Sequence, residues 1–515
     1  MTPLGGRPVL LLLAGVLAAC GPRDGALQEA QRQQLRDYPA LEFDETAAGE
    51  ADLELPLGPE DSLLVEHAYG EIVVRAGGDR PPRATAAIEV TARREGTARR
   101  VLADSRLEAE RTPAGLVLRL VQPERASVPG GEEGLRFVSS ARLVIDVPPR
   151  TRLSIESQRG DVSVTGPCGA TRVMSRRGDV RLRNVRGGAI VECTTGNVKL
   201  RQLSGGPVRA ETGQGLVALV GAEVDAIRLA SRKGRIAARN ARAAALEIRA
   251  AEGGIELAEI EGEIDAETGA GALVLTAASG RRVRARSELG SVVVRDVRAL
   301  ALEAFAARGV LTAERIAADT LDLATGTGAI VLTDVAGELT ARTGAGAIDA
   351  ERLRGGRLLL EAGREGVSVR GASGNLEAVA RRDRIRIEGL EGGLVARADL
   401  GSISAAGVFR DLDASSGTGR VVVEAREGSR VIEPWSLRAD QGDVVLTLPP
   451  SFSCDIEATA GEGAFASELP VRFAAESSAA GRALRGTIGE GGGKIVLTTE
   501  RGSIAVRRGR AAAER

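Results

Sequence analysis

Apolar and polar residues alternate in short runs along most of the chain. Val162-Ser163-Val164 and Val180-Arg181-Leu182 are typical runs, and the residues between such runs are rich in Gly, Asn, Asp and Ser. A period of two predicts half-buried β-strands, because successive side chains of a strand point to opposite faces, whereas an amphipathic helix has a period near 3.6. The intervening residue types favour turns, since they tolerate positive φ.

The strand pattern repeats. A glycine, one variable residue and two apolar residues in alternation recur, mostly at intervals of 17 to 20 residues, with a second strand-like run midway, as at 189–193 and 338–341. A two-strand unit cannot bury its own apolar face, so each must stack on its neighbours. The unit begins at Gly160, Gly178, Gly196, Gly215, Gly234, Gly254, Gly271, Gly290, Gly309, Gly328, Gly346, Gly366, Gly401, Gly419 and Gly442, and Ile385 and Ile387 fill the one long interval.

We therefore predict an all-β protein, a parallel β-helix-like β-solenoid of about fifteen two-strand rungs over residues 151–447. At about 4.8 Å per layer the stack forms a rod roughly 70 Å long. Composition agrees with a thin core of small aliphatic side chains, because 66 of 515 residues are Gly and aromatic residues make up 2%.

The two ends of the repeat array are less regular. We expect an N-terminal β-cap over residues 51–150, with strands at 71–74, 86–90, 115–120 and 142–147. Residues 448–515 should hold the C-terminal rungs and cap, with an excursion at 467–486 and last strands at 493–497 and 502–506. A strand followed by Pro-Pro occurs in both end regions. Caps are needed because an open terminal rung would expose unpaired backbone.

The N-terminus predicts export. Residues 1–19 have the form of a signal peptide, with Arg7 before a short apolar run, and Leu17-Ala18-Ala19-Cys20 resembles the bacterial lipobox. That resemblance implies a lipidated Cys20, a tether over residues 20–50 and a mature protein held on a membrane surface by its acyl chains. Gly21 favours the outer membrane if the cell has two membranes. The alternative is a plain signal peptide cut at an Ala-x-Ala-like site.

Charge and cysteine content argue against nucleic-acid binding and against a disulfide-stabilised fold. The chain has 69 basic and 70 acidic residues, a net charge of -1, so it lacks the overall basic character of a nucleic-acid-binding protein. Once Cys20 is lipidated, Cys168, Cys193 and Cys454 remain, which is an odd number. The residue one repeat before Cys193 is Ser175, so Cys168 and Cys193 should not stack. We expect no disulfide framework and three small, partly buried thiols.

Several stretches resemble a known family, the domain of unknown function 4097, described as adhesin-like β-strand repeats. They are Ile145-Asp146-Val147-Pro148, the Gly-Asp-Val turns at Gly160 and Gly178, and the closing segment from Gly492 to Ile504. The resemblance implies an all-β repeat fold and brings no catalytic residues. This chain departs from the family in its larger number of rungs and in having Arg where Ser or Thr precedes several glycines.

Few residues could support chemistry. We expect the single histidine, His67, to have a surface or capping role, and the Arg-Gly-Asp sequences ending at Asp161 and Asp179 to be repeat turns and not integrin motifs. The Gly489–Lys494 stretch lacks both the first glycine and the Ser or Thr of a phosphate loop.

Two kinds of charged site remain as alternatives. Carboxylates stacked on neighbouring rungs could form a calcium site or a glycosidase-like pair. The cluster of Arg176, Arg177, Arg181, Arg183 and Arg186 is either a solvated face or a site for anionic polysaccharide or lipid headgroups.

We therefore expect a non-enzymatic envelope lipoprotein, adhesin-like or structural, that presents a binding surface to an envelope polysaccharide or a surface protein. We assign no catalytic residues, metal ligands or cofactor, and no binding residues. A self-associating scaffold that stacks end to end is the first alternative. A polysaccharide-active β-helix enzyme is the second, and it is disfavoured because Trp435, Tyr38 and Tyr69 are the only Trp and Tyr available as sugar platforms.

Overall fold

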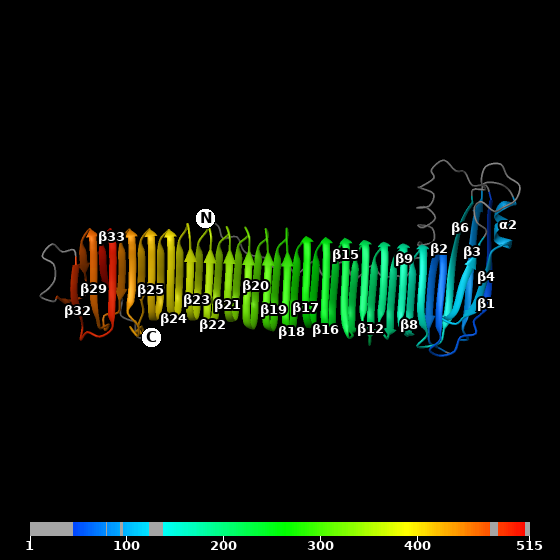
Figure 1. Cartoon of the computed structure of the whole chain (residues 1–515), viewed down its shortest axis with the longest axis horizontal. Coiled ribbons are helices and arrows are strands. Elements are labelled where there is room, and N and C mark those ends of the chain that lie inside the picture. Colours follow the sequence, from blue (N-terminus) through cyan, green and yellow to red (C-terminus); the bar gives the residue numbers. More distant parts are fainter. Residues whose placement is uncertain (1–44, 79, 93–95, 123–136, 474–482, 510–515) are drawn as a thin grey trace, which may run out of the picture.

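The computed structural model describes residues 45–78, 80–92, 96–122, 137–473 and 483–509. They form a long rod of stacked strands (Figure 1). The predicted parallel β-solenoid is confirmed, with about 16 turns and 2% helix. Within this part of the chain, no helix has the length and apolarity needed to cross a membrane. The predicted signal peptide, Cys20 and most of the tether lie outside the described residues.

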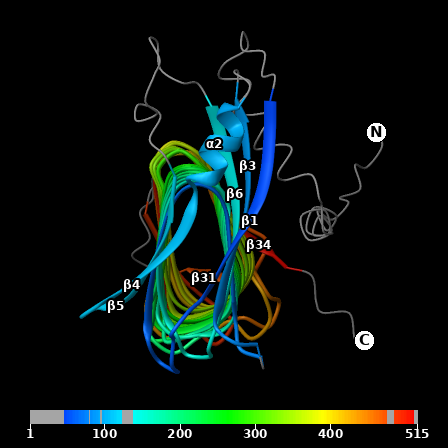
Figure 2. The same ribbon diagram turned by 90° about the vertical axis from the view of Figure 1, so that its right-hand side faces the viewer.

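Each turn contributes one strand to each of two sheets, and the sheets face each other across a flattened core (Figure 2). We call them sheet A, whose strands follow the repeat glycine, and sheet B. Ten long strands cross from sheet A to sheet B: β16 (Ile236–Glu252), β17 (Ile255–Ala270), β18 (Leu273–Ser287), β19 (Val292–Ala306), β20 (Leu311–Thr325), β21 (Ile330–Thr343), β22 (Ile348–Ala362), β23 (Val367–Ala380), β24 (Ile385–Leu400) and β25 (Ile403–Thr418).

The other strands belong to one sheet each, except β2 (Ser62–Ala76), which contributes to both. Sheet A also holds β1 (Glu45–Glu54), β3 (Arg83–Ala92), β6 (Phe137–Val147), β8 (Val162–Cys168), β10 (Val180–Arg186), β12 (Val198–Ser204), β14 (Val217–Glu223), β26 (Val421–Ala425), β28 (Val444–Leu448), β30 (Phe465–Ser467) and β34 (Ile504–Arg508). Sheet B also holds β4 (Arg106–Thr112), β5 (Gly115–Val121), β7 (Arg152–Arg159), β9 (Thr171–Arg177), β11 (Ala189–Thr195), β13 (Val208–Gln214), β15 (Ala226–Lys233), β27 (Trp435–Gln441), β29 (Cys454–Glu462), β31 (Val471–Phe473), β32 (Ala483–Ile488) and β33 (Lys494–Arg501).

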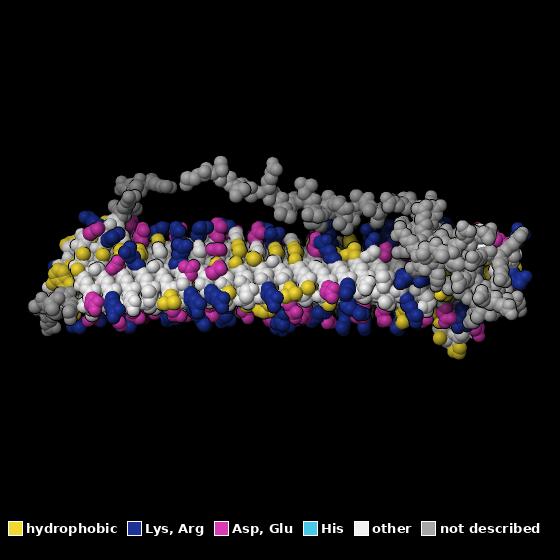
Figure 3. Space-filling model, turned by 90° about the horizontal axis from the view of Figure 1, so that it is seen from above, with side chains coloured by type: hydrophobic (Ala, Val, Ile, Leu, Met, Phe, Trp, Pro, Cys, Tyr) yellow, Lys and Arg dark blue, Asp and Glu magenta, His cyan; other side chains and the backbone are white. Residues whose placement is uncertain are grey.

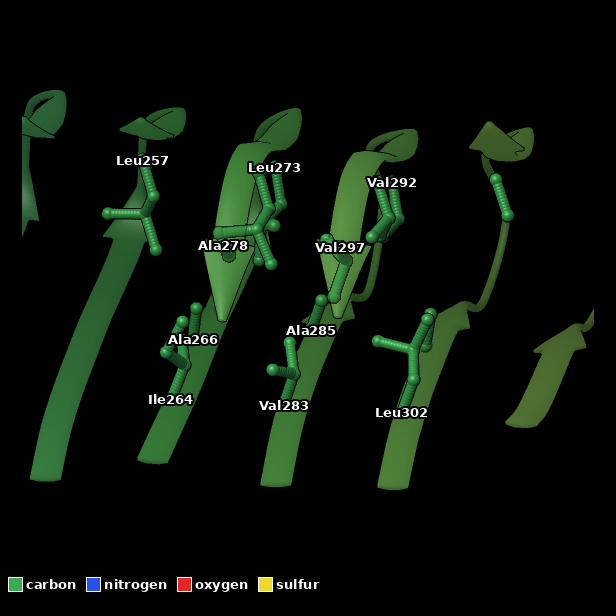
Figure 4. Packing of buried hydrophobic residues seen from close by; sticks show 14 of the residues in the cluster. Leu257, Ile264, Ala266, Leu273, Ala278, Val283, Ala285, Val292, Val297 and Leu302 are labelled. Atoms are coloured by element: carbon green, nitrogen blue, oxygen red, sulfur yellow. The ribbon is translucent and has the colours of Figure 1, made fainter. Parts of the chain in front are cut away.

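The core is a set of columns of small aliphatic side chains. Leu273 lies in register with Ile255 of the preceding turn and with Val292 of the following turn, and all three side chains are buried. Figure 4 shows Ala266 and Ala285 in the facing sheet, so small aliphatic side chains from both sheets fill the gap between them. The layers repeat at about 4.8 Å, and small aliphatic side chains fill these columns, in agreement with the scarcity of aromatic residues.

The repeat glycines form a column at one edge of the rod. A Cβ placed on these glycines would lie 1.8 to 2.4 Å from the carbonyl oxygen of the residue one layer below. No side chain fits there, and many of these glycines also have positive φ. Figure 3 looks onto the edge where the strands of sheet B end, and a strip of backbone and small side chains runs along it.

The register corrects two of the predicted column positions. Gly253, not Gly254, stacks between Gly234 and Gly271. Glu365, not Gly366, lies two residues before Val367, which pairs with Ile348. In both cases a glycine lies between the true column position and the apolar residue that starts the strand, and it obscures that position in the sequence.

A second column of left-handed residues forms the opposite corner. Non-glycine residues hold φ between 51° and 58° there in successive turns. Only Asn, Asp and Gly adopt this conformation readily. Arg315 and Arg352 in this column donate to Asp296 and Asp334 one turn away, at 2.6 and 2.9 Å in each pair. The members are Asn184, Gln202, Asn240, Glu259, Ala277, Asp296, Arg315, Asp334 and Arg352, with Gly221, Gly371 and Gly389.

At both ends the order of turns in space differs from the order in the chain. The turn formed by β2 lies between the β5/β6 turn and the β7/β8 turn. Likewise β33 and β34 lie between β27/β28 and the outer β29/β30 turn. In each case the chain steps over the inserted turn at a Pro-Pro pair, Pro148-Pro149 or Pro449-Pro450. The strand-then-Pro-Pro pattern therefore marks a two-layer step.

Antiparallel strands extend both sheets at the N-terminal end and sheet B at the C-terminal end, where sheet A finishes in the short parallel strand β30. At the N-terminal end, β1 and β3 extend sheet A, β4 extends sheet B, and helix α2 (Thr97–Ala103) packs against β1 and β3 (Figure 2). At the C-terminal end, β32 and β31 pair antiparallel beyond β29. The outermost strands are either strongly charged, as β4 is, or three residues long, as β31 is. Both features oppose edge-to-edge pairing.

Candidate functional site

His67 lies inside the rod, so the predicted surface or capping role is wrong. The residue is 4% exposed and faces the core with Leu63 and Val65, its neighbours on the same face of β2. Its Nε2 atom is buried without a hydrogen-bond partner. The alternation along Leu63, Val65 and His67 was the signal that could have placed the imidazole inward.

His67 begins a column of residues that carry nucleophilic atoms. It pairs with Ser157, and Ser175 and Cys193 follow on the next two turns. The hydroxyls of Ser157 and Ser175 are buried and also have no hydrogen-bond partner. A catalytic pair needs a base hydrogen-bonded to its nucleophile and access for substrate. This column has neither, so its residues are packing elements of the core.

The buried imidazole predicts a pH-dependent N-terminal end. Burial lowers the pKa of His67 from 6.5 to about 4, although hydrogen bonds with the backbone of Ala141 and Tyr69 act in the opposite direction. The unfolded state then binds more protons between these two pH values. Stability is complete above about pH 6.5, falls as the pH drops, and is reduced by about 3 kcal/mol near pH 4.

Amide exchange measured from pH 7 to pH 4 checks this expectation. Exchange in β2, corrected for intrinsic rates, should accelerate on acidification, while β19 and β20 serve as internal controls. A His67→Asn variant should lose the acceleration between pH 6.5 and pH 4. If the variant and the parent respond alike, His67 is not the titrating group.

A Ser/Thr column lies three residues before the repeat glycines. The hydroxyl of Thr212 donates to the carbonyl of Gly196 at 3.0 Å, and Cys193 takes the same position with Sγ 3.5 Å from Gly178 O. These bonds tie each turn to the one below and satisfy a buried carbonyl. The Ser/Thr-x-x-Gly spacing was visible in the sequence. The same bond is made by Ser231, Thr268, Ser287, Thr343, Ser416 and Thr499.

The three described cysteines are free and fully buried, which is more burial than the sequence suggested. Burial raises the pKa of the Cys168 and Cys454 thiols to about 12 and raises that of Cys193. A thiol that stays protonated is a poor nucleophile. Cys193 pairs with Ser175, as the repeat spacing predicted, and Cys168 pairs with Val185.

The Arg-Gly-Asp carboxylates are used within the fold. Asp161 accepts the backbone N–H of Asp179 at 2.8 Å, and Asp179 accepts that of Asn197 at 2.9 Å. Arg181 joins both carboxylates, at 2.8 and 3.1 Å. The two sequences are therefore turns of the repeat, with their acidic groups hydrogen-bonded from turn to turn.

The Gly489–Lys494 stretch is the turn between β32 and β33. Gly489 and Gly491 have φ of 63° and 86°, and the carboxylate of Asp455 accepts the N–H of Gly492 at 3.5 Å. A phosphate loop offers its N–H groups to a ligand. Here the chain's own carboxylate occupies that place.

Carboxylates stacked on sheet B are bridged by arginines. Arg249 contacts Asp265 at 2.7 Å and also pairs with Glu267. Hydrogen bonds from Arg284, then Arg282, lower the pKa of Glu303 to about 2. The described residues contain no group of three or more His, Cys, Asp or Glu able to hold a metal ion. Arginines that bridge neighbouring turns neutralise these carboxylates, so no bound cation is needed to explain their stacking.

Sheet B carries a shallow groove along the rod axis. It has a volume of about 500 Å³, a floor of small side chains such as Ala226 and Ala245, and a wall that includes Arg228 and Glu247. A neighbouring hollow of about 410 Å³ contains Phe305, which is 40% exposed. Sequence reasoning did not find either hollow, because they depend on which outward residues are small on successive turns.

The chain has only low sequence identity to two solved structures. No curated protein matches the chain. A "putative cell adhesion protein" from Clostridium sporogenes has 8% identity and a TM-score of 0.14, over 90% of this chain and 100% of its own. A "putative adhesin" from Bacteroides fragilis has 12% identity and a TM-score of 0.17, over 59% of this chain and 96% of its own. TM-scores this low carry no argument.

The family match is extensive. The model of the Toastrack DUF4097 family matches residues 84–282 and 276–507, so the two matches together span most of the rod and reach into both end regions. This agrees with the stacked two-strand turns and with the repeated glycine column. The chain belongs to the Toastrack DUF4097 family.

Proposed function

We propose that this chain is an exported, lipid-anchored protein of the cell envelope that acts by binding and not by catalysis. Its solenoid holds a stiff surface away from the membrane, and that surface contacts an envelope polysaccharide or a surface protein. The observation that carries the proposal is the rod itself, with two long sheet faces open to solvent and antiparallel strands over both sheets at the N-terminal end and over sheet B at the C-terminal end. A long rigid face is suited to contacting a partner over many turns.

The same ends argue against the self-associating scaffold. Stacking end to end pairs the terminal strands of two rods, and charged or very short terminal strands oppose that pairing. Here β1 ends sheet A and β4 ends sheet B at the N-terminal side, and both strands are rich in charged side chains. The polysaccharide-active enzyme is also disfavoured, because Asp265, Glu267 and Glu303 on sheet B are engaged by arginines.

The anchor is tested by labelling. The full chain, expressed in a bacterium that processes lipoproteins and fed an alkyne-tagged palmitate analogue, should become labelled and fractionate with membranes. Cys20→Ser should abolish the label. Cys193→Ser is the matched control, since a hydroxyl suits its position between Ser175 and Thr212, and it should label normally. A label that persists in Cys20→Ser would refute lipidation there.

The non-enzymatic part needs a separate measurement. The purified protein should bind isolated envelopes and leave envelope polysaccharides unchanged in length and reducing ends. Release of any oligosaccharide that is abolished when an acidic residue of the sheet B groove, such as Glu247 or Asp265, is replaced by its amide would show catalysis and overturn this part of the proposal.

A further inference from the structure

The charges of the rod are unevenly distributed along its length. Residues 159–249 contain seventeen Lys and Arg against seven Asp and Glu, a net charge of +10, whereas the whole chain has a net charge of -1. The remaining residues therefore carry a net charge of -11. These basic residues occupy consecutive turns, from the β7/β8 turn to the start of β16 and its crossing into sheet B.

Within this region, cations stack directly on cations. On sheet A, Arg181 pairs in register with Lys199, and Arg183 with Arg201, one layer apart at about 4.8 Å. Like charges on directly adjacent strand positions destabilise a sheet. The later turns avoid this arrangement: Arg295 pairs with Glu314 at 3.0 Å, and Arg315 with Asp296 at 2.6 Å. The basic turns therefore carry a cost that the rest of the rod does not.

Most of these stacked cations lack an acidic partner. Arg181 is held by Asp161 and Asp179. Arg183 donates to the neutral side chain of Gln202 at 3.4 Å. In the part of the chain that the structure describes, Lys199, Arg201 and Arg186 form no ion pair. Arg183, Arg186 and Arg201 are exposed. We call Arg183, Arg186, Lys199 and Arg201 the basic patch.

We propose that the basic patch on sheet A binds a linear anionic polysaccharide, which crosses the rod at these turns. The patch is a band two layers deep, and it ends at the uncharged Ala218 and Val220 of the next turn. A polysaccharide chain that lies parallel to β10 and β12, and so crosses the rod, stays over these cations. A flat anionic membrane laid along sheet A would also meet Asp349 and Glu351 farther along the same face, so its attraction would be opposed.

This inference rests on the proposed binding function and specifies its ligand. The test uses the full chain with the Cys20→Ser substitution, which removes the proposed acyl anchor and the need for detergent, and three probes: polygalacturonate, neutral dextran of similar length, and phosphatidylglycerol vesicles. This Cys20→Ser chain is the parent of the variants below. Polygalacturonate should bind, with an affinity that falls steeply with salt because bound counterions are released. Dextran should not bind.

Two triple variants distinguish binding by the basic patch from attraction to any exposed cation of sheet A. Arg183→Gln, Lys199→Gln and Arg201→Gln together should weaken polygalacturonate binding by about tenfold or more and flatten its salt dependence. The matched control replaces Arg295, Arg370 and Arg386, exposed cations of sheet A farther along the rod, by Gln and should bind like the parent.

Three outcomes would overturn the inference: equal losses in both triple variants, no binding to polygalacturonate, or tighter binding to the vesicles than to polygalacturonate. A separate measurement of binding to isolated envelopes, made with the parent protein and with the patch variant, distinguishes failure of this inference from failure of the proposed function. If the parent binds envelopes and the patch variant binds them equally well, the polysaccharide inference fails and the envelope-binding function stands.

Discussion

A Gly234→Ala variant is expected to lose about 3 kcal/mol or more of local stability in the middle of the solenoid. Gly234 has φ of 151°, and a Cβ there would lie 2.0 Å from the carbonyl oxygen of Gly215. The backbone conformation and the overlap are both unfavourable, and neither can be relieved by rotating a side chain. The adjoining layers must separate, which also breaks the hydrogen bond from the hydroxyl of Ser231 to Gly215.

The damage should spread through the stack. A solenoid is stabilised by contacts between neighbouring turns, so one weakened interface divides the rod into two units. Urea unfolding followed by far-UV circular dichroism should show an earlier transition, and limited proteolysis should cut near Gly234. Gly356→Ala is the matched control, because no atom lies within 4 Å of the added Cβ. Equal stability of the two variants would show that the column tolerates side chains.

The regular part of this fold could be predicted from local pattern because each residue meets its own equivalents in the next layer. Val180 stacks on Val198, and Val198 on Val217, so the spacing along the chain is also the register in space. The same reasoning located Cys193 over Ser175. It failed by one residue at Gly253 and Glu365, where the neighbouring glycine obscured which position the backbone required.

The ends could not be predicted in this way. Insertion of β2 between β5/β6 and β7/β8 depends on pairing between segments far apart in sequence, and no local property distinguishes it from sequential stacking. The corner column is similar: Ala277 and Arg315 adopt left-handed φ because their turns are stacked in register, although their residue types disfavour it. The basic patch was visible as composition, but its unpaired stacking required the register.

Replacing Trp435 by Ala is the second change with a large expected effect, about 3 to 5 kcal/mol in the C-terminal turns. Trp435 is fully buried at the start of β27, and it contacts Phe409 with ring centroids 6.3 Å apart and Phe452 at 5.6 Å. Its Nε1 donates to the carbonyl of Arg410 at 3.2 Å. The core elsewhere is built mainly from aliphatic side chains, so these three rings form an exceptional cluster in it.

The expected result is local opening of β27 and β33, since Trp435 pairs with Ile495 and the inserted β33/β34 turn depends on that contact. Amide exchange should accelerate in β27, β33 and β29 and stay unchanged in β19 and β20. Trp435→Phe is the control, because it keeps an aromatic ring against Phe409 and loses only the bond to Arg410 and part of the volume, so its effect should be smaller. If exchange in the C-terminal strands is unaffected by the alanine, the register of the inserted β33/β34 turn, and not the aromatic cluster, holds this end of the rod together.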